Sequence, residues 1–180
     1  MIKYDCIFFD RDGTINHDPG YISKLKYYKF FEFVIEAMTL LANVSDKFIM
    51  VTNQSGVSRG LISEADLLQI NDFIMGELIS NKIPLKKIYF CTDHPDSPSE
   101  RRKPNTGMFL EASREFDINL GNCLMIGDSV SDIEPAIALG MDSMLVRTGN
   151  GKNHQNNLIG SKKPKYIAEN ILTGARLLNK

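Results

Sequence analysis

The sequence predicts an α/β fold of three layers, with a parallel sheet between two layers of helices. Strand-like apolar runs alternate with helical patterns along the whole chain, and those runs are continuously apolar. Strands buried on both faces of a parallel sheet have this pattern, whereas half-exposed strands alternate apolar and polar residues. The chain has 180 residues, 43% of them hydrophobic, which is enough to bury a core. We therefore expect a single domain over residues 1–180.

The expected elements follow in order along the chain. Runs rich in Ile, Val, Phe, Met and Leu predict five strands, at residues 5–9, 47–52, 87–91, 122–127 and 143–147. Helical patterns lie between them at residues 32–44, 63–80, 106–116 and 132–139, and a last element ends in residues 171–178. Ser63 is expected to cap the second helix, since Ser accepts hydrogen bonds from the free N–H groups of a first turn. The polar stretch 149–163 predicts a flexible surface loop.

Charge and composition limit the classes of partner. The formal net charge is −1 and the pI is about 6.3, so no basic excess is available to bind nucleic acid. No apolar stretch approaches the roughly 20 residues of a membrane span, and the first residues do not resemble a signal peptide. We expect a cytoplasmic protein and a monomer. The three cysteines are scattered in apolar runs, which predicts buried, reduced thiols.

Two carboxylates stand where the first strand ends, in the segment Asp10-Arg11-Asp12-Gly13-Thr14. Side chains at i and i+2 share one face of a strand, and two carboxylates about 4 Å apart repel by roughly 4 kcal/mol at an effective dielectric near 20. A divalent cation or a shared proton would offset this cost. The alternative is a solvated turn, because Asp and Gly are ordinary turn residues.

Polar residues also follow two other predicted strands. Thr52-Asn53-Gln54-Ser55-Gly56 follows the second strand, and Gly127-Asp128-Ser129-Val130-Ser131-Asp132 follows the fourth. Arg102-Lys103-Pro104 precedes the third helix. Ligands of open α/β sheets bind beyond the carboxyl ends of the strands, so we expect these groups to converge. Such a set would bind Mg²⁺ through hard oxygens and a phosphate through hydroxyl, amide and ammonium groups.

These residues resemble the four motifs of the haloacid dehalogenase superfamily of phosphotransferases, in the expected order. Asp10-x-Asp12-Gly13-Thr14 resembles the first motif, Thr52 the second, Lys103 the third, and Gly127-Asp128-x-x-x-Asp132 the fourth. The wider context is similar to the subgroup that contains heptose-bisphosphate phosphatases and histidinol phosphatases; it comprises residues 10–16, Asp18-Pro19-Gly20-Tyr21, residues 52–60 and residues 102–104. The resemblance covers about residues 7–148. It implies a Rossmann-like core with strand order 3-2-1-4-5 and no sizeable cap domain.

The resemblance also implies a role for each matching residue. Asp10 would be the nucleophile that forms an aspartyl-phosphate, and Asp12 the general acid and base. Mg²⁺ would be bound by the carboxylates of Asp10 and Asp128 and by the backbone carbonyl of Asp12. Thr52, Asn53 and Lys103 would bind the transferred phosphoryl group. The sugar would be contacted by the segment after the first motif and by three further side chains: Asp18, Pro19, Gly20, Tyr21, Gln54, Ser55 and Arg102.

The function implied is a Mg²⁺-dependent phosphatase that removes the C7 phosphate of D-glycero-D-manno-heptose 1,7-bisphosphate during synthesis of ADP- or GDP-heptose precursors of surface polysaccharide. Histidinol phosphate is the alternative substrate, and the anomer preference stays open. A signalling domain with a lasting phosphate on Asp10 is a second class, but the predicted base Asp12 disfavours it because it would speed hydrolysis. A polynucleotide-end phosphatase would need a basic groove.

The chain departs from its relatives in two places. Many relatives have a zinc loop with four ligands, whereas Cys91 and His94 supply at most two here, so no structural zinc is expected. Family members often have a basic residue where this chain has Ser129. Asp132 is expected to cap its helix or hold Lys103, while the role of Arg59 stays open. His17 and His154 are expected to be exposed loop residues.

Overall fold

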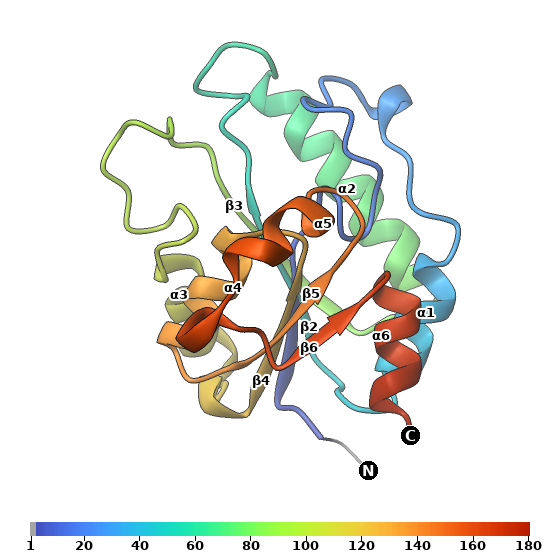
Figure 1. Cartoon of the computed structure of the whole chain (residues 1–180). Coiled ribbons are helices and arrows are strands. Elements are labelled where there is room, and N and C mark those ends of the chain that lie inside the picture. Colours follow the sequence, from blue (N-terminus) through green and yellow to red (C-terminus); the bar gives the residue numbers. More distant parts are fainter. Residues whose placement is uncertain (1–2) are drawn as a thin grey trace.

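The computed structural model describes residues 3–180 and contains a six-stranded parallel sheet (Figure 1). Its spatial order is β3-β2-β1-β4-β5-β6, which confirms the predicted parallel sheet and the order of its first five strands. The sixth strand pairs with β5 at the edge of the sheet. The strands are β1 (Cys6–Phe9), β2 (Phe48–Asn53), β3 (Leu85–Cys91), β4 (Cys123–Gly127), β5 (Asp142–Val146) and β6 (Tyr166–Ala168).

The helices connect the strands in the predicted alternation. They are α1 (Val34–Leu41), α2 (Glu64–Ser80), α3 (Gly107–Phe116), α4 (Val130–Ala138), α5 (Gly151–His154) and α6 (Ile171–Leu178). Short 3-10 turns lie at Leu25–Tyr27, Leu120–Asn122, Gln155–Asn157 and Gly160–Lys162. The predicted cap of α2 is confirmed, since the Ser63 hydroxyl accepts a hydrogen bond from the backbone N–H of Asp66 at 3.1 Å.

The sheet buries both of its faces, as the continuous apolar runs predict. Alternate residues of a strand point to opposite faces: Ile7 and Phe9 of β1 join a cluster with α1, α2 and α6, while Cys6 and Phe8 join a second cluster with α3 and α4. Figure 1 shows α1 and α6 on one side of the sheet and α3 and α4 on the other. The three-layer architecture is therefore confirmed.

Residues 149–163 lie mostly at the surface, as predicted, but the prediction of an irregular loop was wrong. The segment contains α5 and two 3-10 turns, and it is attached to the core. Arg147 donates from Nε to the side-chain oxygen of Gln155 at 2.8 Å, and Leu158 is buried against Ile133 and Leu145. These elements have three or four residues each, too few for a helical period to show in the sequence.

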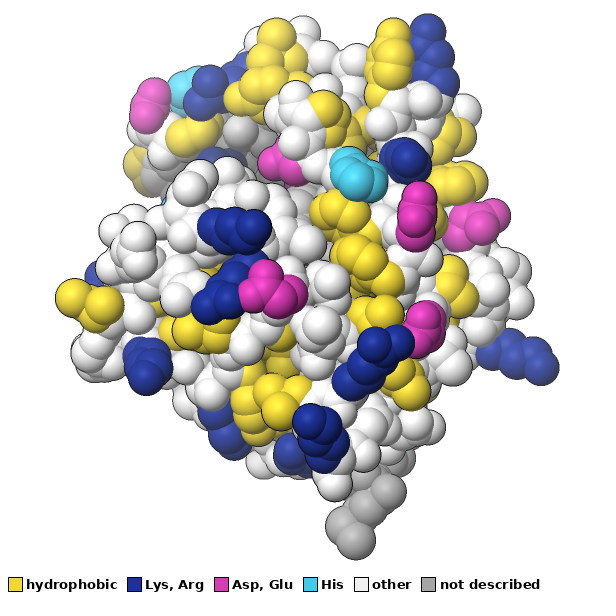
Figure 2. Space-filling model, turned by 45° about the vertical axis from the view of Figure 1, so that its right-hand side comes forward, with side chains coloured by type: hydrophobic (Ala, Val, Ile, Leu, Met, Phe, Trp, Pro, Cys, Tyr) yellow, Lys and Arg dark blue, Asp and Glu magenta, His cyan; other side chains and the backbone are white. Residues whose placement is uncertain are grey.

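Other sequence predictions have structural counterparts. Cys6, Cys91 and Cys123 are buried free thiols, as predicted. The connection between β1 and α1 covers residues 10–33. It is well short of the roughly 50 residues of a small domain, so it is too short to form a sizeable cap domain. Within residues 3–180, none of the helices combines the length and apolar character that a membrane span requires. Lys and Arg side chains are scattered among acidic and apolar ones on the face shown in Figure 2.

Candidate active site

The site lies beyond the carboxyl ends of three central strands. Asp10 follows β1, Thr52 and Asn53 end β2, and Asp128 follows β4. Because β1 lies between β2 and β4, the strand order reverses at this point, which is where open α/β sheets bind ligands. A cavity of about 310 Å³ opens there. The predicted residues that line it are Asp10, Asp12, Asp18, Gly20, Tyr21, Thr52, Asn53, Gln54, Ser55, Arg102, Lys103 and Asp128.

Three carboxylates meet at the floor of this cavity. Asp10, Asp128 and Asp132 are buried, and each places a carboxylate oxygen within 4.8 Å of the others. We call these three residues the acidic trio. Gly13 allows the close approach: its φ is +79°, and a Cβ there would lie 2.3 Å from Oδ2 of Asp128. A side chain at position 13 would therefore be both strained and in collision with the trio.

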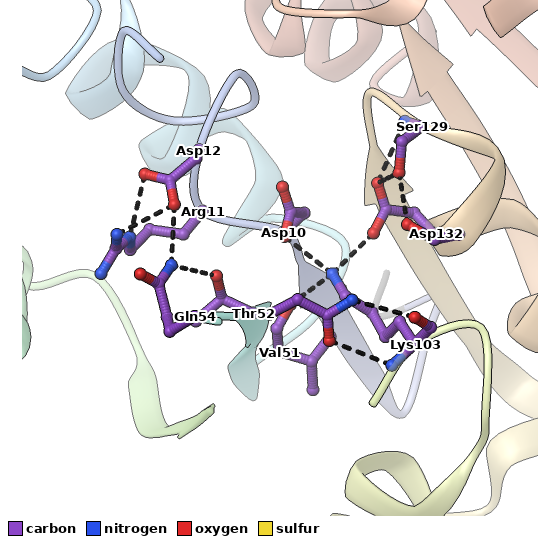
Figure 3. Close-up of polar contacts among 11 residues, drawn as sticks. Asp10, Arg11, Asp12, Val51, Thr52, Gln54, Lys103, Ser129 and Asp132 are labelled. Atoms are coloured by element: carbon purple, nitrogen blue, oxygen red, sulfur yellow. Dashed lines mark hydrogen bonds and ion pairs between the residues drawn. The ribbon is translucent and has the colours of Figure 1, made fainter. Parts of the chain in front are cut away.

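Lys103 is the one ammonium group that contacts the acidic trio within the described chain. Its Nζ donates to Asp10 Oδ1 at 2.7 Å, to Asp132 Oδ1 at 2.6 Å and to the carbonyl of Val51 at 2.7 Å (Figure 3). A lysine has three donors, so all three are engaged with protein atoms. Figure 3 shows the other carboxylate oxygen of Asp10 pointing away from Lys103.

Three carboxylates with one ammonium leave the trio short of positive charge. Burial, with the negative charges of Asp132 and Asp12 added, raises the pKa of Asp10 to about 7 although Lys103 opposes the shift. Burial and the charges of Asp10 and Asp132 raise the pKa of Asp128 to about 8. Burial disfavours the Lys103 ammonium, but the two carboxylates it contacts raise its pKa overall. Carboxylate oxygens are what hard divalent cations prefer, and such a cation would relieve this repulsion.

Asp132 has a mainly supporting position within the trio. Its Oδ2 accepts from the backbone N–H of Ser129 at 3.0 Å and from the Ser129 hydroxyl at 2.7 Å, at the start of α4. Its Oδ1 accepts from Lys103. Both contacts were anticipated as alternatives, and the structure contains both. Ser129, at the position where relatives often have a basic residue, is thus engaged in capping α4.

Asp12 is set apart from the trio by its own set of donors. Arg11 donates to both of its carboxylate oxygens, Nε to Oδ1 at 3.1 Å and Nη2 to Oδ2 at 2.9 Å. Asn16 adds a bond to Oδ1 at 2.9 Å and Gln54 a bond to Oδ2 at 2.7 Å. Burial favours the neutral acid, but the Arg11 charge and these hydrogen bonds lower the pKa of Asp12 overall. The sequence predicted repulsion between Asp10 and Asp12, and the charge of Asp12 does contribute to the raised pKa of Asp10, but the carboxylates that cluster with Asp10 are those of Asp128 and Asp132.

Two predicted ligand contacts, Asn53 at the end of β2 and Gln54 directly after it, are engaged with other site residues. The Asn53 side chain bonds to both backbone groups of Lys103, accepting from its N–H at 3.0 Å and donating to its carbonyl at 2.9 Å. Gln54 donates both to Asp12 and to Thr52 Oγ1, the latter at 2.8 Å. These amides therefore fix the positions of Lys103, Asp12 and Thr52.

The remaining walls of the cavity come from the segment after β1 and from α5. Gly20 donates from its backbone to Asp18 at 2.8 Å, whereas Pro19, predicted as a contact, does not line the cavity described above. His154 does, although it was expected to be an exposed loop residue; its Nδ1 is buried with no hydrogen-bond partner among the described residues. Gly56 and Ser131, from two of the segments that were expected to converge here, also line the cavity, whereas Ile62 and Asn150 were not expected. His154 belongs to α5, which has four residues, too few to give a periodic signal in the sequence.

The segment where many relatives bind zinc has different contacts here. The Cys91 thiol donates to Asp93 at 3.3 Å, and the backbone N–H of Asp96 donates to Nδ1 of His94 at 3.3 Å. Ser99 accepts from the backbone of Arg102 at 3.0 Å. Hydrogen bonds of this kind order the loop that carries Arg102 and Lys103 to the cavity.

A family model, curated relatives and a solved structure all match this chain to the phosphatase family that the motifs resemble. A family model described as HAD-hydrolase-like matches residues 100–174. The D-glycero-beta-D-manno-heptose-1,7-bisphosphate 7-phosphatase of Photorhabdus laumondii is 39% identical over 156 residues, which cover 82% of this chain and 83% of that protein. The D-glycero-alpha-D-manno-heptose-1,7-bisphosphate 7-phosphatase of Burkholderia mallei is 35% identical over 152 residues, covering 81% and 80%.

A solved structure extends the likeness over almost the whole chain. The D,D-heptose 1,7-bisphosphate phosphatase of B. bronchiseptica, complexed with magnesium and phosphate, superposes with a TM-score of 0.87 at 29% identity and covers 97% of each chain. Sequence identity, coverage and fold all agree with the four motifs. This chain belongs to the haloacid dehalogenase-like hydrolases, in the family of the heptose-1,7-bisphosphate 7-phosphatases.

Proposed function

We propose that this protein is a Mg²⁺-dependent phosphatase that removes the C7 phosphate of D-glycero-D-manno-heptose 1,7-bisphosphate, in the synthesis of ADP- or GDP-heptose precursors of surface polysaccharide. The observation that carries the proposal is the arrangement at the carboxyl ends of β1, β2 and β4. There a carboxylate bonded to Lys103 and a second, separately held carboxylate line one cavity. Of the two relatives named above, the one from Photorhabdus laumondii is named for the β-anomer and the one from Burkholderia mallei for the α-anomer, so the anomer is a matter for experiment.

The acidic trio fits the metal that the B. bronchiseptica enzyme contains. Asp10 and Asp128 would hold Mg²⁺ through carboxylate oxygens, with the backbone carbonyl of Asp12 as a further ligand, while Asp132 remains bonded to Lys103 and Ser129. The bound ion would supply positive charge between the anionic nucleophile and the anionic phosphate. The raised pKa values of Asp10 and Asp128 support this assignment, because they arise from burial first and from repulsion between the carboxylates second, and a bound cation would oppose both.

In the first chemical step Asp10 attacks phosphorus. The carboxylate oxygen that points away from Lys103 forms a bond to phosphorus, and the bond from phosphorus to the C7 oxygen of the sugar breaks. The electron pair stays on the C7 oxygen, which takes a proton from the Asp12 carboxyl group. Lys103 fixes the orientation of Asp10 through its 2.7 Å contact.

In the second step the aspartyl-phosphate on Asp10 is hydrolysed. Asp12, now ionised, takes a proton from water as the water oxygen bonds to phosphorus, and the bond between phosphorus and Asp10 breaks. The Asp10 carboxylate is thereby regenerated and phosphate is released. Thr52 lies near the carboxyl end of the neighbouring strand β2, with its hydroxyl bonded to Gln54, and it would bind phosphoryl oxygens in both steps.

The test is phosphate release with Mg²⁺ from the α- and β-anomers of heptose 1,7-bisphosphate and from histidinol phosphate. We expect kcat/KM for one heptose anomer to exceed that for histidinol phosphate by 100-fold or more, about 2.7 kcal/mol of transition-state discrimination. A preference for histidinol phosphate would overturn the proposed substrate and retain the proposed chemistry.

A further inference from the structure

Asp12 is held by an unusually complete set of hydrogen bonds. A carboxylate offers about four lone-pair positions, and four protein donors occupy them: two from Arg11 and one each from Asn16 and Gln54, at 2.7–3.1 Å. The Asp12 side chain remains 20% exposed, and it lines the cavity. Its orientation is therefore fixed before any ligand enters.

Arg11 supplies half of these contacts from behind the site. Its side chain is 1% exposed, and it is among the largest fully buried side chains of the protein. It does not belong to the lining of the cavity described above. Nη1 contacts the side-chain oxygen of Asn71 on α2 at 3.4 Å, so the guanidinium is itself anchored on a long helix.

A buried arginine of this kind is costly unless its charge is matched. Removing a buried charge from water costs several kcal/mol, and only well-made ion pairs offset that cost. The planar guanidinium matches a carboxylate with two parallel hydrogen bonds, a geometry that a lysine cannot reproduce. The pair therefore fixes both the position and the plane of the Asp12 carboxylate.

We propose that Arg11 is a positioning residue for the leaving-group step: it holds Asp12 with one edge toward the cavity, where the departing oxygen must receive its proton. This inference rests on the proposed function. Arg11 does not touch the substrate, and it acts only through Asp12. Of the three residues that donate to Asp12, Gln54 lines the cavity. A protonated carboxyl has one acceptor position fewer, so one hydrogen bond must break when Asp12 carries the proton. We infer that it is the bond from Gln54.

This role makes the effect of Arg11 depend on the leaving group. When the P–O bond of a sugar phosphate breaks, the alkoxide needs a proton and therefore needs Asp12 in place. When the P–O bond of p-nitrophenyl phosphate breaks, the phenolate leaves with its electron pair and needs no proton. For both substrates kcat/KM covers the steps up to release of the alcohol or phenol, so it isolates the step in which Asp12 acts as an acid.

The experiment compares kcat/KM of wild type, Arg11→Met and Arg11→Lys on the heptose bisphosphate and on p-nitrophenyl phosphate, at saturating Mg²⁺. For Arg11→Met we expect a loss of about 100-fold on the sugar phosphate, as for a misplaced catalytic group, and a change of less than about threefold on the aryl phosphate. Arg11→Lys keeps the charge but loses the paired geometry, and it should fall between wild type and Arg11→Met on the sugar phosphate. Arg176→Met is the matched control, because Arg176 pairs with Glu36 on the exposed surface at 2.8 Å.

The outcomes separate this inference from the proposed function. Equal losses on both substrates would overturn the positioning role, as would no loss on either. If Arg11→Met does not fold, the ratio of the two kcat/KM values for Arg11→Lys decides: an unchanged ratio would overturn the inference. A wild-type protein that hydrolyses the aryl phosphate but not the heptose bisphosphate would contradict the proposed substrate, and another alkyl phosphate that it turns over would then replace the sugar in the test.

Discussion

Asp10 and Asp12 are two residues apart, yet their carboxylates lie in opposite electrostatic settings. Around Asp10, three carboxylates share the ammonium of Lys103, and burial with mutual repulsion raises the pKa of Asp10 to about 7. Around Asp12, one carboxylate has four donors, and Arg11 holds its pKa below the ordinary value. The first half of the site has too little positive charge for its three carboxylates, a deficit that the proposed Mg²⁺ would remove, whereas protein donors satisfy the second half. In the proposed mechanism, these separate settings would suit Asp10 to act as the nucleophile and Asp12 to act as the acid.

The largest effect is expected from removing the nucleophile. Asp10→Asn keeps the size of the side chain but cannot form an aspartyl-phosphate, so turnover should fall by more than about 10⁴-fold. Steady-state phosphate release measures it. Asp72→Asn, a change on the exposed surface of α2, is the control and should retain wild-type turnover. Measurable turnover within tenfold of wild type in Asp10→Asn would refute the nucleophile assignment.

Metal removal should nearly match this loss, because the three carboxylates around Asp10 have only the Lys103 ammonium as counter-charge within the described chain. EDTA is expected to reduce turnover by about 10³-fold or more, and added Mg²⁺ to restore it. Asp128→Asn should raise the Mg²⁺ concentration that gives half-maximal activity by at least about tenfold, since it removes a carboxylate ligand. Unchanged turnover in EDTA would contradict the metal site.

Asp12→Asn sharpens the comparison, since it should damage the chemistry and spare the metal. We expect kcat/KM on the sugar phosphate to fall by about 100-fold or more. The Mg²⁺ concentration that gives half of the rise in thermal midpoint should stay within about threefold of the wild-type value, because the Asp12 side chain lies outside the acidic trio. If Asp12→Asn raised the required Mg²⁺ concentration as much as Asp128→Asn does, the Asp10 and Asp12 halves of the site would not be separate.

The smallest expected effect is on stability as a function of pH. In EDTA, the folded protein retains protons on Asp10 and Asp128 up to about pH 7 and 8, whereas the unfolded chain loses them near pH 3.8. The folded state thus binds more protons between these values, so its stability falls as pH rises. Asp12 contributes in the opposite sense, but its stabilisation is lost only as pH falls below the ordinary range for Asp.

Thermal unfolding in EDTA at pH 5 and pH 8 measures the balance. The thermal midpoint should be lower at pH 8 by several degrees, since about 1 kcal/mol shifts it by roughly 2–4 °C in a chain of this size. Saturating Mg²⁺ should remove most of that difference, and Asp10→Asn should reduce it in EDTA. A midpoint in EDTA that rises from pH 5 to pH 8 would contradict the crowding of the trio.

Most of the fold was predictable because its signals are long and regular. Five apolar strands gave clear patterns, while β6 has three residues and follows directly after Pro164 and Lys165, so it carries no pattern of its own. The helix α5 has four residues, and its place over the site depends on tertiary contacts. Gly149, just before α5, is one such contact. A Cβ at this position would lie 2.1 Å from Oδ2 of Asp128, and the sequence alone does not reveal that restriction.

The residue types of the candidate site were predictable from its motifs, but their pairing was not. Sequence spacing placed Asp10 and Asp12 on one face of a strand. In the structure Asp10 lies just after the end of β1, and the Asp12 carboxylate is bonded to the guanidinium of Arg11, the residue between them in the sequence. Lys103 was expected to bind phosphate, and its three donors are engaged with protein atoms. Which donor meets which acceptor depends on side-chain directions at several strand ends, and spacing along one chain does not specify those.

The separate duties of the two carboxylates can be tested by trapping the intermediate. Asp12→Asn, mixed with Mg²⁺ and p-nitrophenyl phosphate, should form the aspartyl-phosphate, because the phenolate leaves without an acid, and should hydrolyse it slowly, because the base is missing. After an acid quench, peptide mass spectrometry should find phosphate on Asp10 in this variant and none in the Asp10→Asn, Asp12→Asn double variant. Phosphate on another residue, or equal rates of intermediate hydrolysis in Asp12→Asn and wild type, would contradict the assignment of nucleophile to Asp10 and base to Asp12.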